Sequence, residues 1–228
     1  MRIRLVGALE GEVPPLNMAS TFDPSTIAFG AKKDTYVSTT MNGRLPRFVL
    51  GSIDAPLRAP HGVSTPYSGA ESAERLTMDL EVQSGELLDA LTALDELIVT
   101  TAVERSKEWF GRQVDEPTAR AWYTPLVKPS KDVEKYPNPT VRTKFSLKRG
   151  KETKVRVPTG GENAYRPGRK DDIVKGADVC VEVTMTSVML GNRSFSASLT
   201  VEQVLLASVA EGPSAGITVF GANLVLEE

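Results

Sequence analysis

Residues 178–208 read DVCVEVTMTSVML-GNRS-FSASLTVEQVLLAS, and they carry the clearest structural signal in the chain. The two arms, 178–190 and 195–208, are rich in β-branched and apolar residues, and a short polar segment containing Gly191 and Asn192 separates them. Apolar arms around a polar turn with glycine and asparagine are typical of a β-hairpin. The sequence therefore predicts two long antiparallel strands here, and a last strand at 217–226.

Alternating residues predict further strands before the hairpin. Leu76, Met78 and Leu80 fall on one side of residues 75–82, with polar residues between them, as in a half-buried strand. By the same pattern, shorter strands are expected at 26–29, 36–40, 47–53, 141–147 and 153–157. Segments rich in Pro, Gly and Asn predict irregular stretches at 54–69 and 159–169.

Two helices are expected between these strands. Leu87, Leu91 and Leu94 begin a pattern with helical spacing, which predicts one amphipathic helix from Ser84 to Gly111. Asp115 and Pro117 have the residue types that begin helices, so a second, shorter helix is expected through Trp122.

The order of these elements indicates the fold class. Strands precede and follow the helices rather than alternating with them, which favours an antiparallel sheet. The expected fold is α+β and mainly antiparallel β: an OB-like Greek-key barrel with a long helix and a short helix inserted. No clean linker interrupts the sequence, so residues 1–228 are expected to form a single OB-like domain with the helical insertion at about 84–123.

Charge is unevenly distributed along the chain. The net charge is −2, but residues 128–175 hold fourteen Lys and Arg against six Asp and Glu, a net of +8. Such a segment is either a solvated loop or a cationic patch that holds phosphates. The cations expected to track a phosphate backbone lie on two strands and the loops that follow them: Arg142, Lys144, Lys148, Arg149, Lys154, Arg156, Arg166, Arg169 and Lys170.

Aromatic residues close to this segment could stack nucleobases. Trp109 and Phe110 end the apolar face of the long helix, so they are expected in the core. Trp122 and Tyr123 are compatible with either core or surface, and Tyr136 has polar, basic neighbours that favour exposure. Tyr136 and Trp122 or Tyr123 are therefore the candidate stacking residues.

No catalytic motif is present. The chain lacks Gly-x-Ser-x-Gly, a phosphate-binding Gly-x-x-x-x-Gly-Lys-Ser/Thr loop and a dinucleotide Gly-x-Gly-x-x-Gly motif. The one histidine, His61, has no metal-ligating residue beside it. The expectation is a protein that is not an enzyme and binds no cofactor or metal.

The one cysteine, Cys180, cannot form an internal disulfide, which favours a reducing compartment. The N-terminus lacks the apolar core of a signal peptide, and no apolar run is long enough to suggest a membrane span. The expected location is therefore intracellular (host nucleus, cytoplasm or viral factory), not secreted, with no membrane as partner.

Short motifs in a fixed order resemble those of a viral protein family. They are Ile27-Ala28-Phe29-Gly30, Ala55-Pro56-Leu57-Arg58-Ala59-Pro60-His61-Gly62-Val63, Trp109-Phe110-Gly111, Tyr123-Thr124-Pro125-Leu126-Val127-Lys128 and Tyr136-Pro137. Across residues 25–225 the chain is similar to OB-fold single-stranded-DNA-binding proteins of large nucleocytoplasmic DNA viruses. The resemblance implies a protein that coats single strands in replication, recombination or repair.

Two functions stay open at this point. The first is sequence-independent binding of single-stranded DNA, with RNA as the alternative polymer. The second is a structural or assembly protein, a virion or scaffold component that self-associates and binds no nucleic acid. Salt separates them, because phosphate contacts weaken steeply as salt is added.

Overall fold

Five strands close on themselves at the centre of the molecule. The computed structural model describes residues 23–65, 75–83, 85–130, 133–134, 137–159 and 164–207. In chain order, the five strands are β4 (Leu57–Ala59), β6 (Arg75–Glu81), β9 (Thr140–Ser146), β12 (Ala177–Leu190) and β13 (Phe195–Leu206). They are hydrogen-bonded in the order β12–β4–β6–β9–β13, and β13 pairs back onto β12.

This ring has the topology that the sequence predicts. The fourth strand, β12, lies beside the first, so the spatial order is fourth, first, second, third, which defines a Greek key. The fifth strand, β13, fills the gap between β9 and β12, antiparallel to β12 and parallel to β9. The expected OB-like Greek-key barrel, within a mainly antiparallel α+β fold, is therefore confirmed.

Eight further strands of the described residues extend the sheet from the ring. On the β12 side these are β1 (Ile27–Lys33), β2 (Tyr36–Met41) and β3 (Arg47–Leu50). The others are β5 (Val63–Ser64), β7 (Tyr123–Thr124), β8 (Val127–Lys128), β10 (Lys154–Pro158) and β11 (Tyr165–Gly168). The parallel pairings in the described part of the chain, with β7, β9 and β10, all involve β13.

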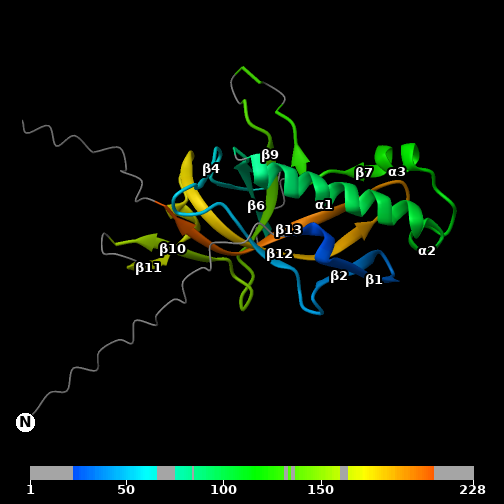
Figure 1. The fold of residues 1–228 in the computed structure, drawn as a ribbon. Coiled ribbons are helices and arrows are strands. Elements are labelled where there is room, and N and C mark those ends of the chain that lie inside the picture. Colours follow the sequence, from blue (N-terminus) through cyan, green and yellow to red (C-terminus); the bar gives the residue numbers. More distant parts are fainter. Residues whose placement is uncertain are drawn as a thin grey trace, which may run out of the picture.

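The helices lie between β6 and β9 in the chain. They are α1 (Gly85–Glu104), α2 (Ser106–Phe110) and α3 (Glu116–Trp122), and short 3-10 turns η1 (Pro24–Thr26) and η2 (Lys170–Asp172) occur elsewhere. In Figure 1, α1 runs lengthwise beside β12 and β13, and β10 and β11 lie at the end of the molecule opposite α2 and α3. The chain thus places its helices over one part of the sheet only.

The single long helix expected from Ser84 to Gly111 is wrong in one respect. The helix is interrupted at Arg105, and α2 is a separate turn that begins at Ser106. Gly111 ends α2 with a φ of 72° and donates its N–H to the Lys107 carbonyl, as expected of a helix-ending glycine. Asp115 caps α3 by accepting the Thr118 N–H.

Two expected loops need correction, and two other expectations fall outside the described residues. The predicted loop at 159–169 contains β11, whose Pro167 and Gly168 hide the strand pattern, and the irregular stretch at 54–69 contains β4 and β5. The last strand expected at 217–226 lies outside the described residues, as does Ser84.

Apolar faces of α1 and of the sheet meet in one core. Leu91, Leu94 and Ile98 of α1 are fully buried, and Trp109 is 1% exposed. The Trp109 ring meets the edge of Phe29 with centroids 5.8 Å apart. The core position expected for Trp109 is therefore confirmed, and Phe110 is half-buried beside it.

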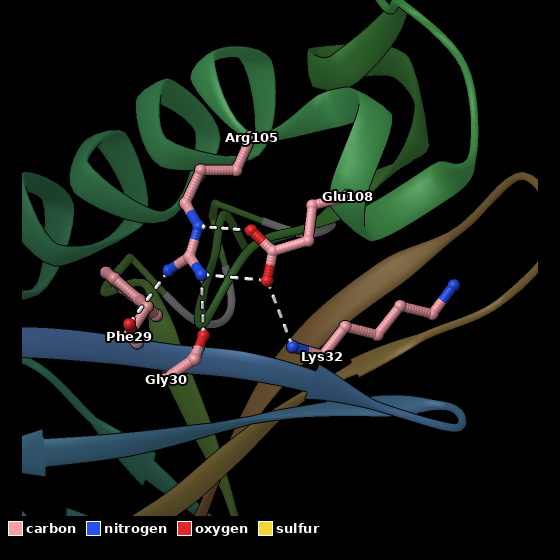
Figure 2. Close-up of polar contacts among 5 residues, drawn as sticks. All are labelled: Phe29, Gly30, Lys32, Arg105 and Glu108. Atoms are coloured by element: carbon pink, nitrogen blue, oxygen red, sulfur yellow. Dashed lines mark hydrogen bonds and ion pairs between the residues drawn. The ribbon is translucent and has the colours of Figure 1, made fainter.

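Arg105 ties the helices to the edge strand β1 (Figure 2). Its two terminal nitrogens donate to the carbonyl oxygens of Phe29 (2.8 Å) and Gly30 (2.9 Å), and it forms two hydrogen bonds to the Glu108 carboxylate. Glu108 in turn accepts the Lys32 N–H at 3.1 Å. A Cβ on Gly30 would lie 2.5 Å from Ser38 Oγ, so a larger residue where β1 approaches β2 would require the Ser38 hydroxyl to move.

Arg105→Lys is expected to lower the free energy of unfolding by about 1–2 kcal/mol, because an ammonium cannot hold both carbonyls and the carboxylate in one plane. Urea denaturation followed by circular dichroism measures it. The same substitution at Arg149, an exposed turn residue, should leave the unfolding midpoint unchanged. Equal midpoints for all three proteins would contradict the structural role of Arg105.

Candidate nucleic-acid interface

Strands β9 and β10 follow one another along the same edge of β13. Thr143 and Lys144 pair with Leu199 and Thr200, and Lys154 to Arg156 pair with 203–205 further along. The intervening chain leaves the sheet after Ser146 and returns at Thr153, whose N–H donates to the Ser146 carbonyl at 2.8 Å. The two basic strands therefore lie end to end along β13 and do not pair side by side as neighbouring strands.

The strand register decides which of these side chains share a surface. Lys144 lies opposite Thr200, and Lys154 lies opposite Gln203, both on the outer side of β13. The adjacent strand residues Leu199 and Val155 point to the core and are buried. Along β13, the two pairing points Thr200 and Gln203 are three positions apart, or about 10 Å of strand.

Some of the predicted cations have acidic partners. Arg142 forms two hydrogen bonds to the Asp79 carboxylate across β6 and β9, at 2.7 and 2.9 Å. Arg166 approaches Asp172 at 3.3 Å and Lys170 approaches Asp171 at 3.6 Å. These pairs offset part of the positive charge that the sequence alone suggests.

The Asp172 carboxylate also organises the η2 turn. Asp172 accepts the Arg169 backbone N–H at 2.6 Å, and this bond, with the Arg166 side chain, holds the pKa of Asp172 below its ordinary value. Arg166 and Arg169 therefore face a carboxylate that stays ionised, which weakens their attraction for phosphate.

Besides Arg169, whose backbone N–H donates to Asp172, four predicted cations have no ion pair with a described residue: Lys148, Arg149, Lys154 and Arg156. The first three are exposed, and Arg156 is half-buried. The Nε of Arg156 is buried without a hydrogen-bond partner, although a guanidinium N–H is a strong donor. These residues, with Lys144, form what we call the β13-edge cation line.

The predicted stacking rings lie elsewhere. Tyr123 pairs with the buried Phe195, its ring centroid 5.0 Å away, so it is on the core side of β13 rather than with Lys144. Its hydroxyl donates to the buried Asp95. Burial, together with the nearby Asp95 carboxylate, raises the pKa of Tyr123 far above its ordinary value. Tyr136 lies outside the described residues.

Trp122 is half-buried at the edge of a cleft. Its ring meets Phe110 edge-on, with centroids 5.6 Å apart, and the Arg112 guanidinium lies 4.7 Å from its centroid. The cleft, of about 490 Å³, is lined by Trp122, by Arg112 and by Arg193 of the hairpin turn. The structure therefore does not bring Trp122 or Tyr123 together with the cation line on one surface, and their stacking role stays a prediction.

Two residues that matter here are absent from the sequence-based set. Asp79 pairs with Arg142, a consequence of strand register that the alternation of 75–82 alone does not reveal. Tyr36 is the only aromatic among the exposed large apolar side chains of the described residues. The alternation of 36–40 places Tyr36 on the other face of the strand from the buried Val37, so the exposure of Tyr36 could have been predicted from sequence.

The fold resembles two bacteriophage proteins at low identity. The single-stranded DNA-binding protein from bacteriophage Enc34 matches with a TM-score of 0.40 and 13% identity, over 83% of this chain and 95% of that one. The single-stranded DNA-binding protein gp2.5 of bacteriophage T7 matches with a TM-score of 0.45 and 14% identity, over 75% and 96%. Both come from bacteriophages rather than from large nucleocytoplasmic DNA viruses.

No protein-family model and no curated protein matches the chain. Within the ranges that the structure describes, none of the helices is both long and apolar enough to cross a membrane.

Proposed function

We propose that this chain binds single-stranded DNA with little sequence preference, through the β13-edge cation line. The observation that carries the proposal is the alignment of β9 and β10 along one edge of the barrel, with Lys154 and Arg156 lacking acidic partners among the described residues. A row of cations at fixed spacing can follow a phosphate backbone without reading bases.

The fold supports this choice of ligand. In OB barrels the face of the second and third strands, with the loops beside it, binds oligonucleotides. Here those strands are β6 and β9, and Lys144 of β9 lies on their outer face beside Thr77. The cation line begins at this face and continues along β10, so one strand of DNA can contact both. A role in replication, recombination or repair belongs to the same proposal.

Salt dependence tests the proposal directly. Binding of a fluorescein-labelled single strand of about 30 nucleotides is followed by anisotropy from ~20 to ~200 mM NaCl. The logarithm of the binding constant falls linearly with the logarithm of the salt concentration, and each neutralised phosphate contributes about −0.7 to this slope. Contacts by the four residues Lys148, Arg149, Lys154 and Arg156 therefore predict a slope of about −2.8.

Duplex of the same length is the control, and it should bind more weakly than the single strand. A slope near zero, or no binding at ~20 mM NaCl, would contradict the proposed function and favour an assembly role.

A further inference from the structure

One row of side chains crosses five strands on the outer surface, beyond the cation line. Paired residues from β1, β2, β12, β13 and β7 form it: Lys33, Tyr36, Met189, Ser196 and Thr124. Tyr36 is 37% exposed and Met189 43% exposed. We call this set the Tyr36 row.

Strand alternation places this row away from the core. The next residues along β2, β12 and β13 are Val37, Val188 and Ala197, and all three are buried. Since successive residues of a strand point to opposite sides, the Tyr36 row faces outward. The neighbouring outward residues Ser38 and Ser187 are paired across the strands and carry only small hydroxyl groups. The Tyr36 ring and the Met189 thioether therefore project beyond the small side chains of these two neighbouring residues.

We infer that Tyr36, supported by Met189, is a base-stacking platform for single-stranded DNA, an inference that rests on the proposed function. A flat aromatic ring on a sheet surface accepts any nucleobase, because every base has a π-face. Met189 adds a polarizable side of the kind that packs against aromatic groups. Lys33, the cross-strand neighbour of Tyr36, supplies a cation for the adjoining phosphate.

The position of the other rings strengthens this assignment. The Tyr123 hydroxyl donates to Asp95, and its ring packs against Phe195 on the core side. Trp109 is buried. Trp122 already has Arg112 over its ring. Among the described residues, Tyr36 thus combines exposure, an aromatic face and a neighbouring cation on the same side of the sheet as Lys144.

Distance allows one strand of DNA to reach both places. The Tyr36 row crosses β13 at Ser196, and Lys144 pairs with β13 at Thr200, about 13 Å further along that strand. Tyr36 on β2 and Lys144 on β9 are also three strand spacings apart, about 14 Å across the sheet. The separation is therefore about 20 Å. A footprint of ~4–16 nucleotides, usual for an OB fold, spans it.

The test separates stacking from phosphate contact. Affinity is measured by anisotropy at ~50 mM NaCl for oligo-dT of about 30 nucleotides and for an abasic strand with the same number of phosphates. The variants are Tyr36→Ala and Tyr36→Phe, with Leu45→Ala as a control that removes an exposed apolar side chain elsewhere.

Tyr36→Ala should weaken oligo-dT binding about tenfold and leave abasic binding unchanged, while Tyr36→Phe and Leu45→Ala bind like the parent. Equal affinities of Tyr36→Ala and parent for oligo-dT, or equal losses on both strands, would overturn the platform.

Two further results keep the test decisive. Photocrosslinking of the parent protein to 5-iodouracil DNA should label the peptide that contains Tyr36, whether or not the alanine variant folds, and labelling confined to other peptides would overturn the inference. If the parent binds neither strand, the proposed function fails as well. If the parent binds both strands equally, the function stands and only the platform fails.

Discussion

Reversing two charges at once, as Lys154→Glu with Arg156→Glu, is expected to weaken single-strand binding by about a hundredfold at low salt. Both residues belong to β10, in the cation line along β13, and neither has an acidic partner among the described residues. Each substitution removes an attraction and adds a repulsion for the same phosphates. Anisotropy titration at ~50 mM NaCl measures the effect.

Neutral substitutions at the same positions give a second readout. Lys154→Gln with Arg156→Gln should make the log–log salt slope about 1.4 less steep, since two phosphate contacts are lost. A weaker affinity with an unchanged slope would show that the two residues act through the fold rather than on phosphate.

Two further variants control for folding and for net charge. Arg156 is half-buried, so Lys148→Glu with Arg149→Glu, in an exposed turn of the same line, should also weaken binding strongly without touching the core. Lys107→Glu changes an exposed lysine on α2, at the opposite end of the molecule from β10, and should bind like the parent (Figure 1). Equal losses in all variants would point to net charge instead of a site.

Asp95→Ala is expected to lower the free energy of unfolding by about 3 kcal/mol. The Asp95 carboxylate, 8% exposed on α1, accepts hydrogen bonds from the Tyr123 hydroxyl and from the N–H groups of Leu126 (3.0 Å) and Val127 (3.4 Å). Without the carboxylate, the Tyr123 hydroxyl and these two backbone N–H groups lose their acceptor. Urea denaturation measures the loss, and Asp89→Ala, at an exposed position of the same helix, should have little effect.

The pH dependence of this contribution has a definite sign. Burial raises the pKa of Asp95 above its ordinary value of 3.8, and the three hydrogen bonds oppose the shift without cancelling it. Between 3.8 and the raised pKa, the folded state therefore binds more protons than the unfolded chain. The free energy of unfolding must fall as pH rises through that window.

Comparison with Asp95→Asn isolates this effect, because Asn does not titrate there. The difference in unfolding free energy, parent minus Asn variant, should be largest below about pH 3.8 and should shrink as pH rises. Carboxyls whose pKa is lowered and that have no interaction with Asp95, such as Glu108 and Asp172, shift stability in the opposite direction but do so equally in both proteins. A difference that grows with pH would show that the hydrogen bonds outweigh burial.

Local sequence patterns were sufficient for the elements with strong periodicity. The hairpin of β12 and β13, the alternation of β6 and β9, and the caps at Gly111 and Asp115 all depend on residues close in sequence, and each is present in the structure. The order of these elements along the chain favoured a mainly antiparallel sheet, because the strands precede and follow the helices.

Pairing between distant strands could not be read in the same way. The end-to-end arrangement of β9 and β10 exists because both find the same free edge of β13, about fifty residues later in the chain. The Asp79–Arg142 pair depends on the register of β6 against β9, and the contacts of the Arg105 side chain depend on carbonyl groups of β1. Each of these features is determined by a partner that a local pattern does not contain.

The place of β13 also fixes the order in which the molecule can assemble during synthesis. Strand β13 follows every other described strand in the chain, yet it is the neighbour of β12, β7, β9 and β10. Until residues 195–206 leave the ribosome, the barrel is open, and β9 and β10 lack the strand that aligns them. The basic segments are thus synthesised well before they form a continuous surface, and we expect closure by long-range, partly parallel pairing to be slow.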